Sequence, residues 1–223
     1  MQETRSVILG AGEVGIALRN VLSDYAPTLI DPKFGSFGVD IQDVTHMHVC
    51  FPYSETFIKD VEEYQARFKP LYTIIHSTVP VGTSRLVNGL HSPIRGIHPH
   101  LAEGIKTFVK FIGGQNASEV ADYFRRAGLR VCLFDAPETT EALKLFDTEY
   151  YRVAIEFAQR VKTYCDKNKL NFHEVYTLGN QTYNEGYTKL GHPEFVRPVL
   201  QPIMTPISGH CVMPNAELIK KSE

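Results

Sequence analysis

The sequence has no tryptophan, only four cysteines, almost no net charge and no long apolar run. A formal net charge of −2 creates no long-range attraction to nucleic acid or to a membrane surface, so we expect neither as a partner. No apolar stretch approaches the roughly 18–20 residues that cross a bilayer. The first residues lead directly into a strand-like segment, so we expect no signal peptide. The cysteines are widely spaced and include no Cys-X-X-Cys pair, which favours reduced thiols and a cytoplasmic location.

The composition is that of an ordinary globular protein, with 223 residues of which 43% are hydrophobic. Up to about residue 136, short β-rich runs alternate with helical stretches. This alternation predicts an α/β fold in which residues 1–136 form a Rossmann-like, doubly wound parallel sheet. The predicted strands are residues 6–9, 28–30, 48–51, 71–75, 95–97, 109–112 and 129–134.

The pattern changes at Pro137. From Glu138 to about Lys167 there is no glycine or proline, and apolar residues recur at helical spacing, which predicts one long helix of roughly 30 residues. A helix of this length usually crosses between domains or forms a dimer interface. We therefore expect residues 137–223 to form a smaller helical domain that supports a homodimer. Within it, residues 171–178 are predicted to be a second helix and residues 179–214 to be irregular.

A glycine motif follows the first predicted strand and opens a helix. It reads Gly10-Ala11-Gly12-Glu13-Val14-Gly15, in which the first glycine makes the tight turn, the second admits a pyrophosphate and the third lets the helix pack on the strand. Asp31 ends the next strand, where a carboxylate binds ribose hydroxyls and favours NAD over NADP. The residues from Gly10 to Gly15, including Glu13 and Val14, and Asp31 are therefore the predicted NAD site, although Lys33 nearby is compatible with NADP. The alternative is a glycine-rich turn that binds no nucleotide.

Four further segments, in this order along the chain, carry a resemblance to a known family. They are Ser77-Thr78-Val79-Pro80-Val81-Gly82-Thr83, Leu101-Ala102-Glu103-Gly104, Glu141-Ala142-Leu143-Lys144-Leu145 and Gly209-His210-Cys211-Val212-Met213-Pro214. Together with the glycine motif, they resemble the UDP-glucose/GDP-mannose 6-dehydrogenase family in order and approximate spacing. The resemblance extends over nearly the whole chain.

The resemblance implies a four-electron oxidation of a primary alcohol to a carboxylate, with two NAD molecules used in turn. Cys211 would be the nucleophile that forms a thiohemiacetal, Lys144 would stabilise oxyanions, and Thr78 would position water or substrate. Protonated His210 or Lys144 would lower the pKa of the Cys211 thiol. Pro52, Ser77 and Thr78 would also contact the cofactor.

The resemblance also implies a substrate site, in which the sequence departs from the family. Leu101, Ala102 and Glu103 match its substrate segment, but His100 and Asn215 stand where the family has acids, and Thr148 stands where it has asparagine. Arg197 is a candidate for the family's substrate arginine, at a different spacing. With 12 residues after Cys211, the sequence is expected to be a shortened member without the family's C-terminal domain. Because two acids are replaced, we expect a smaller acidic or phosphorylated alcohol, of a sugar or nucleotide-sugar type, as substrate.

Several alternatives remain open. The histidine pairs His46/His48 and His98/His100 suggest a metal site, but no usual zinc spacing occurs, so we predict no metal. His100 and His210 are instead candidates for substrate contacts or acid–base groups. Two other functions also fit the sequence. One is a catalytically idle NAD-binding or scaffold protein, and the other is a two-electron dehydrogenase of the 6-phosphogluconate or 3-hydroxyacid type.

Overall fold

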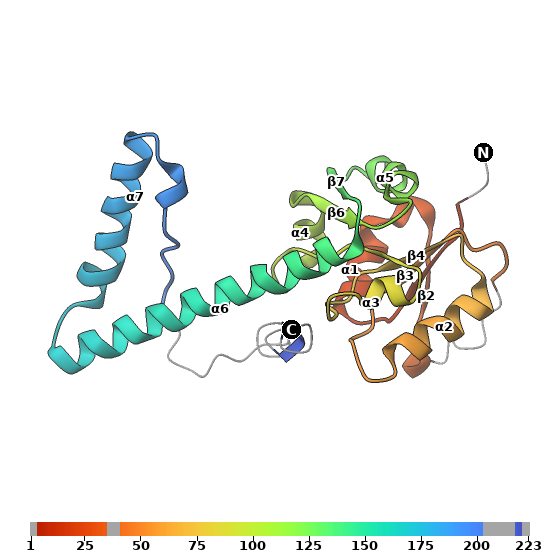
Figure 1. The fold of residues 1–223 in the computed structure, drawn as a ribbon, viewed down its shortest axis with the longest axis horizontal. Helices are drawn as coiled ribbons and strands as arrows, with labels where there is room; N and C mark the ends of the chain where they lie inside the picture. The colour runs from red at the N-terminus through yellow and green to blue at the C-terminus, as the bar shows by residue number, and fades with distance from the viewer. Residues whose placement is uncertain (1–3, 35–40, 203–216, 220–223) are drawn as a thin grey trace. The chain divides into compact units, whose positions relative to one another are not determined.

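The computed structural model describes residues 4–34, 41–202 and 217–219, and its ribbon is drawn in Figure 1. The chain divides into two compact units. The first extends to Leu145 and contains the sheet, and the second begins at Phe146 and is helical where it is described.

The first unit is built on a seven-stranded sheet in the order β2-β1-β3-β4-β5-β6-β7. Neighbouring strands are parallel except β5 and β6, which pair antiparallel. The strands are β1 (Ser6–Leu9), β2 (Thr28–Ile30), β3 (His46–Val49), β4 (Tyr72–Ile75), β5 (Leu90–His91), β6 (Lys110–Gly113) and β7 (Val131–Phe134). Because β2 lies on one side of β1 and β3 on the other, the sheet is doubly wound.

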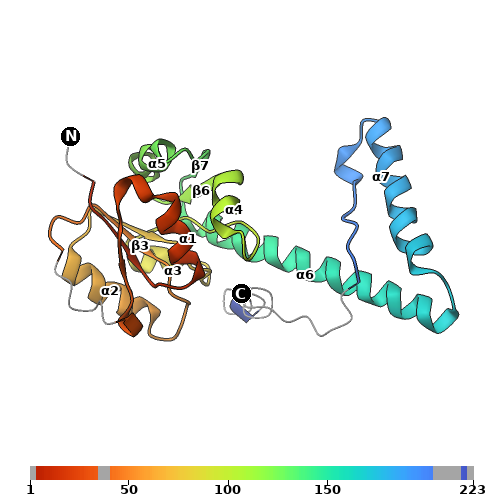
Figure 2. The same ribbon diagram turned by 180° about the vertical axis from the view of Figure 1, so that it is seen from behind.

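Helices cover both faces of this sheet, as Figure 2 shows. They are α1 (Glu13–Val21), α2 (Phe57–Phe68), α3 (Thr83–Leu86), α4 (Leu101–Thr107) and α5 (Ala117–Arg126). Side chains of β1 alternate between two cores: Ile8 packs with α1, α4 and α5, whereas Val7 and Leu9 pack with α2. Phe124 and Phe57 are among the largest side chains buried in the first and second core, respectively. The predicted α/β, Rossmann-like, doubly wound fold is confirmed.

One predicted strand is wrong. Residues 95–97 form no strand; the fifth strand is the two-residue β5, and the chain then turns into α4. The physical reason is a close backbone approach. Gly96 has φ +158°, and a Cβ on Gly104 would lie only 2.6 Å from the Cα of Gly96. The segment is therefore packed against α4 instead of extending the sheet. The third strand also begins two residues earlier than predicted, at His46.

The long helix is confirmed as α6 (Pro137–Asn168), an uninterrupted element of 32 residues that begins in the first unit and continues into the second. In the second unit its Ile155, Ala158 and Cys165 are buried, as is Tyr176 in the π-helix His173–Leu178. Among the described residues, no helix combines the length and apolar character needed to cross a bilayer.

The prediction of an irregular segment after residue 178 is wrong in its first part, because residues 179–189 form α7 (Gly179–Lys189). Gly179 and Gly186 have low helix propensity, but contacts of α7 outweigh it. Tyr183 and Tyr187 stack one turn apart, with ring centroids 5.9 Å apart. The side chain of Asn184 joins the backbone of Arg197 through both its oxygen and its nitrogen, each at 2.8 Å.

A group of buried histidines lies in the first unit. His46 and His48 lie on the same face of β3, and His48 Nδ1 is 3.0 Å from Nε2 of His76, which follows β4. His91 in β5 is fully buried. Burial lowers the pKa of His46 to about 4 and that of His91 to about 3. Burial is also the first cause that lowers the pKa of His48 and His76 well below the usual value. These side chains are therefore neutral in the folded protein near neutral pH.

We predict that acid destabilises the first unit. The unfolded chain protonates its histidines near pH 6.5, whereas the folded chain keeps them neutral down to about pH 4 and 3. The stabilisation is thus fully present above pH 6.5 and is lost as the pH falls, by about 1.4 kcal/mol per pH unit for each such histidine. Urea unfolding between about pH 7 and pH 5 measures this slope.

A matched pair of variants tests whether buried histidines cause the loss of stability in acid. His46→Phe is expected to flatten the slope, because phenylalanine cannot titrate and Nε2 of His46 is buried without a hydrogen-bond partner. His173→Gln, at an exposed position, is the control that leaves the slope unchanged. Equal slopes in all three proteins would contradict the assignment.

Candidate functional site

The carboxyl ends of β1, β2 and β3 meet where the sheet order reverses. The chain passes from β1 to β2 on one side and then crosses to β3 on the other side of β1. A crevice opens at the carboxyl edge where the order reverses in this way, and open α/β sheets bind ligands there. Gly10 directly follows β1, Asp31 follows β2, and Phe51 follows the end of β3 by two residues. The topology therefore brings the glycine motif and Asp31 together.

The three glycines differ in what surrounds them. A Cβ on Gly15 would lie 1.9 Å from the carbonyl oxygen of Gly10, so α1 packs directly on the turn. Gly10 has φ +100°, and a Cβ there would approach the backbone nitrogen of Phe51 to 3.0 Å. Nothing lies within 4 Å of a Cβ on Gly12. The first and third glycines are thus required by packing, whereas the second leaves open space at the start of α1.

Asp31 is tied to the backbone on both sides of the crevice. Its Oδ2 accepts a hydrogen bond from the backbone N–H of Ala11 at 2.8 Å, and its Oδ1 accepts one from that of Lys33 at 2.9 Å. The carboxylate is half-buried and fixes the glycine turn relative to the end of β2.

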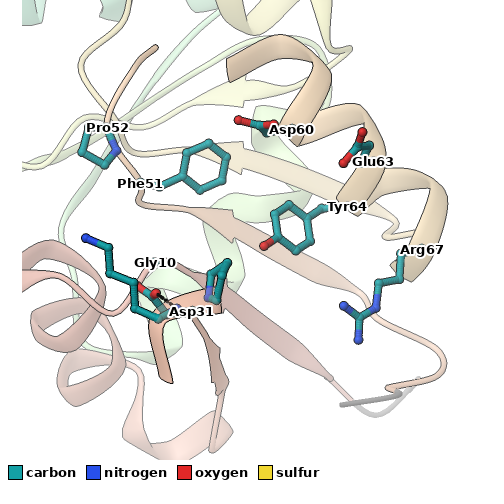
Figure 3. Close-up of a pocket in the computed structure, with 10 residues that line it drawn as sticks. Gly10, Asp31, Phe51, Pro52, Asp60, Glu63, Tyr64 and Arg67 are labelled. Atoms are coloured by element: carbon teal, nitrogen blue, oxygen red, sulfur yellow. Dashed lines mark hydrogen bonds between the residues drawn. The ribbon is translucent and has the colours of Figure 1, made fainter. Parts of the chain in front are cut away.

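A cavity of about 440 Å³ lies at this edge, as Figure 3 shows. It is lined by Gly10, Asp31, Pro32, Lys33, Phe51, Pro52, Asp60, Glu63, Tyr64 and Arg67. Of the predicted cofactor residues, Gly10, Asp31 and Pro52 therefore line it, whereas Gly12, Glu13, Val14, Gly15, Ser77 and Thr78 do not.

Helix α2 forms one wall of the cavity, and the sequence analysis did not predict its residues as part of the site. Asp60, Glu63, Tyr64 and Arg67 are spaced i, i+3, i+4 and i+7, which is one face of a helix. In Figure 3 these side chains line the same side of the cavity. The signal was therefore present as a polar stripe, but only the fold shows that the stripe faces the glycine turn.

Tyr64 gives this cavity a partly apolar wall. Its ring is stacked with Phe68 at 6.1 Å and tilted against Phe51 at 6.3 Å between centroids. Burial raises the pKa of the Tyr64 hydroxyl; Arg67 opposes this shift and Asp31 adds to it. The hydroxyl is thus neutral, and the cavity offers a flat aromatic surface together with carboxylates and two cations.

A second group of predicted residues lies at the carboxyl ends of β4 and β5. The hydroxyl of Ser77 donates to the carbonyl of Phe51 at 2.6 Å, which links the end of β4 to that of β3. The Thr140 hydroxyl lies 2.9 Å from Nδ1 of His91, whose Nε2–H donates to the Ser77 carbonyl at 3.3 Å. Thr78 beside them is half-buried.

The first turns of α6 are fastened to the same loops. Buried Glu141 accepts hydrogen bonds from the backbone N–H groups of Gly82 at 2.6 Å and Ser84 at 2.8 Å. Burial raises the pKa of this carboxyl, and the hydrogen bonds from Ser84 and Gly82 oppose the rise. One turn further along the helix, Lys144 Nζ donates to the carbonyl of Ile94 at 3.0 Å.

Lys144 thereby contacts the loop that leads to the predicted substrate segment. In that segment Leu101 is buried in the core, Ala102 is half-buried and Glu103 is exposed. His100 is also exposed, with Nδ1 3.9 Å from Oε2 of Glu103. Glu13 of the glycine motif pairs with Nδ1 of His98 at 2.5 Å, so the two predicted sites adjoin.

The remaining predicted residues lie elsewhere. Cys211, His210 and Asn215 fall outside the described residues. Thr148 and Arg197 belong to the second unit; Thr148 is half-buried on α6, and the Arg197 guanidinium lies 4.3 Å from the ring centroid of Tyr183. Among the described residues, no cluster of histidine, cysteine or acidic side chains has the arrangement of a metal site.

Comparisons with known proteins place the fold. No family of known sequences and no curated protein matches the chain. Solved structures do match. UDP-D-ManNAc dehydrogenase from Pyrococcus horikoshii superposes with a TM-score of 0.69 at 19% identity, over 94% of this chain and 53% of that one. The UDP-N-acetyl-mannosamine dehydrogenase Cap5O from Staphylococcus aureus superposes with a TM-score of 0.70 at 16% sequence identity, over 98% of this chain and 66% of that one.

A third match covers less of this chain. A conserved protein of unknown function with structural similarity to 3-hydroxyacid dehydrogenases gives a TM-score of 0.62 at 13% identity, over 85% of this chain and 81% of that one. At these identities the matches establish the fold, which is that of UDP-sugar and related dehydrogenases, as the motifs predicted. The chain spans about half to two thirds of the length of the two sugar dehydrogenases.

We predict opposite outcomes for alanine at two of the glycines. Gly15→Ala is expected to destabilise the first unit by about 3 kcal/mol, because the added methyl group meets a backbone carbonyl that cannot move independently. Gly12→Ala, at an extended residue with open space around it, is the matched control and changes stability by less than about 1 kcal/mol. Urea unfolding followed by circular dichroism measures both. A Gly15→Ala protein as stable as the wild type would contradict the packing argument.

Proposed function

We propose that this chain is an NAD-dependent dehydrogenase that oxidises a primary alcohol of a sugar or sugar phosphate to the carboxylate. The observation that carries the proposal is the open space at Gly12, at the start of α1, next to a cavity bounded by Asp31 and the aromatic side chain of Tyr64. Cytoplasm is the proposed location, and the three described cysteines, which form no disulfide, are consistent with it.

The residues present fit a dinucleotide. The free N–H groups and positive end of α1 suit a pyrophosphate beside Gly12. The Asp31 carboxylate suits the adenosine ribose hydroxyls and disfavours a 2′-phosphate, so NAD is the proposed cofactor. Phe51 and Tyr64 provide apolar surface for the base. When bound, the oxidised nicotinamide supplies a hydride acceptor.

The chain's own residues supply the rest of the chemistry. As the alcohol becomes an aldehyde, its hydroxyl proton passes to solvent and a hydride leaves its carbon for the acceptor. Lys144, whose amine already donates to a carbonyl oxygen, stabilises the negative charge that develops on the substrate oxygen. The Cys211 thiolate then adds to the aldehyde carbon, and loss of a second hydride converts the thiohemiacetal into a thioester. Water hydrolyses the thioester, which releases the carboxylate and regenerates the thiol. Thr78 positions this water or the substrate.

The proposed substrate is a small acidic or phosphorylated alcohol. His100 is exposed at the start of the α4 segment, where the related family has an acid, and Asn215 replaces another acid. Removal of two negative charges lowers the repulsion that an anionic substrate meets. Glu103 and Arg197 are further proposed substrate contacts, together with Leu101, Ala102 and Thr148.

The proposed assembly is a homodimer formed through α6. In the second unit Phe146, Tyr150, Val153, Phe157 and Tyr164 are between 46% and 64% exposed. Their spacing of four, three, four and seven residues is the pattern of a helix–helix seam. Exposed apolar stripes of this kind mark interaction surfaces, and a second copy of the same helix matches the stripe in length and chemistry.

A two-electron dehydrogenase is the second candidate. The chain superposes on the protein with similarity to 3-hydroxyacid dehydrogenases over 81% of that protein's length, which is more than for the sugar dehydrogenases above. This candidate needs Lys144 but no cysteine. A catalytically idle NAD-binding protein would need neither.

Turnover stoichiometry tests the function. With NAD and a panel of phosphorylated sugars and nucleotide-sugars, we expect two NADH per substrate molecule, measured by absorbance against the carboxylate formed. Lys144→Met is expected to lower kcat by about a hundredfold, since it removes one charge-stabilising donor. Cys211→Ser is expected to prevent formation of the carboxylate, because the thioester cannot form.

Control variants and NADH binding distinguish the three candidate functions. Cys132→Ser alters an exposed thiol on β7 and should leave turnover unchanged. One NADH per substrate, unaffected by Cys211→Ser, would contradict the four-electron reaction and favour the two-electron dehydrogenase. NADH binding without turnover would favour the idle protein. Failure of the wild type to bind NADH, measured by fluorescence, would overturn the cofactor proposal itself, and Gly12→Ala is expected to weaken that binding.

Light scattering during gel filtration tests the dimer. The wild type is expected at twice the chain mass of 25.2 kDa, and Tyr150→Glu/Val153→Glu at the mass of one chain, since two buried charges in a seam are costly. Lys189→Glu introduces the same charge at an exposed position on α7 and should leave the dimer intact. A wild-type protein with the mass of one chain would contradict the proposed assembly.

A further inference from the structure

A buried lysine, Lys110, lies beside the proposed active site and has no role in the proposed reaction. Lys110 is only 3% exposed, and it forms no ion pair with any carboxylate of the described residues. It is the first residue of β6, which runs antiparallel to β5, so its side chain lies at the carboxyl end of β5. A lysine is almost never buried unless its amine has partners.

The partners of this amine are the carbonyls of one loop. Lys110 Nζ donates to the carbonyl oxygens of Ser92 at 2.7 Å and Pro93 at 3.1 Å. The next carbonyl, that of Ile94, accepts from Lys144 Nζ at 3.0 Å. Two lysine amines thus bind three consecutive carbonyls, those of residues 92, 93 and 94. Three hydrogen bonds from buried amines therefore hold this loop at its start.

The held loop continues into the proposed substrate segment. Gly96 and Gly104 are in such close contact that a Cβ on Gly104 would lie 2.6 Å from the Cα of Gly96. His98, between them, pairs with Glu13 of the glycine motif. Displacement of residues 92–94 would therefore shift α4 and His100 at its start, together with the oxygen that Lys144 contacts.

A chain of buried polar side chains ends at the same loop. Nδ1–H of His76 donates to the Ser92 carbonyl at 2.6 Å, so this carbonyl accepts from both His76 and Lys110, whose donor nitrogens lie 3.2 Å apart. His76 then joins His48 at 3.0 Å, and His48 joins the Tyr123 hydroxyl at 3.1 Å. Tyr123 in turn contacts the hydroxyl of Ser6 at 3.1 Å. Each member has a donor and an acceptor available, so the chain is satisfied from Ser6 to the loop.

We propose that Lys110 is a positioning residue, which fixes the loop of residues 92–94 and, through it, Lys144 and the 98–104 segment of the active site. This inference rests on the proposed function only in identifying that segment as part of an active site. Burial lowers the pKa of the Lys110 amine to about 7, an effect that Cys50 opposes and Lys144 adds to. The amine therefore remains a hydrogen-bond donor in either charge state, with two or three protons.

Hydrogen–deuterium exchange of the full chain, resolved by peptide, tests the proposal. Lys110→Met keeps the length and apolar stem of the side chain but removes its donors. Exchange in peptides that cover residues 92–104 is expected to rise about tenfold, since loss of the two hydrogen bonds to Ser92 and Pro93 shifts local opening by roughly that factor. Lys106→Met, at an exposed position of α4, is the control and should change nothing. Should the methionine variant fail to fold, Lys110→Gln, which keeps a shorter donor, is measured in the same way.

Two further readouts distinguish positioning from general stabilisation. NADH affinity, measured by fluorescence, is expected to be unchanged, because Lys110 does not line the cavity at Gly10 and Asp31. In turnover, kcat is expected to fall about tenfold at unchanged KM for NAD, since Lys144 is displaced and the cofactor site is not. Unchanged exchange in residues 92–104 would overturn the proposal, as would a rise spread evenly over all strands. A wild type that binds no NADH would count against the proposed function alone, because the exchange result does not depend on it.

Discussion

The arrangement of the candidate site depends on the buried carboxyl group of Glu141. It joins the first turns of α6 to the backbone N–H groups of Gly82 and Ser84, and Glu138 adds a charge pair with Arg85 at the surface. Burial of a carboxyl group is unfavourable, as the raised pKa of Glu141 indicates, and the two backbone donors offset that cost. Because Lys144 follows Glu141 by one helical turn, this contact also determines where the lysine amine lies. One local contact thus orients the catalytic candidate of the first unit.

The features that could be predicted from sequence are those with a local cause. The β1–turn–α1–β2 motif was predictable because its main steric requirement is local: a Cβ on Gly15 would meet the carbonyl oxygen of Gly10, five residues earlier. Helix α6 was predictable because 32 residues contain no helix breaker after Pro137. The short β5 and the helix α7 were mispredicted, since the first depends on a close approach of Gly96 to Gly104 and the second on contacts that outweigh the propensity of two glycines.

The parts of the site that were missed have non-local causes. The side chains of α2 form a visible polar stripe, but the direction that the stripe faces is set by how the helix crosses the sheet. Lys110 gives no signal at all in sequence, because a lysine at the start of a strand is normally exposed. Its burial follows from the reversed direction of β6, which brings its first residue to the carboxyl end of β5. Cys132 is another side chain whose exposure has a non-local cause: it lies in an apolar run, yet it is exposed because β7 is an edge strand.

The two proposed reactions differ less than their products suggest. Oxidation of an alcohol to an aldehyde or ketone requires a site for the nicotinamide cofactor, a donor for the developing charge and an ordered substrate loop. The described residues supply candidates for all three, in the glycine turn with Asp31, in Lys144 and in residues 98–104. The proposed second oxidation uses one addition, a thiolate that captures the aldehyde before it leaves, since a thiohemiacetal carries the hydrogen that the next hydride transfer removes. The proposed four-electron reaction thus needs the same site as the two-electron reaction, with the thiolate of Cys211 in addition. The loop held by Lys110 and Lys144 would serve either reaction.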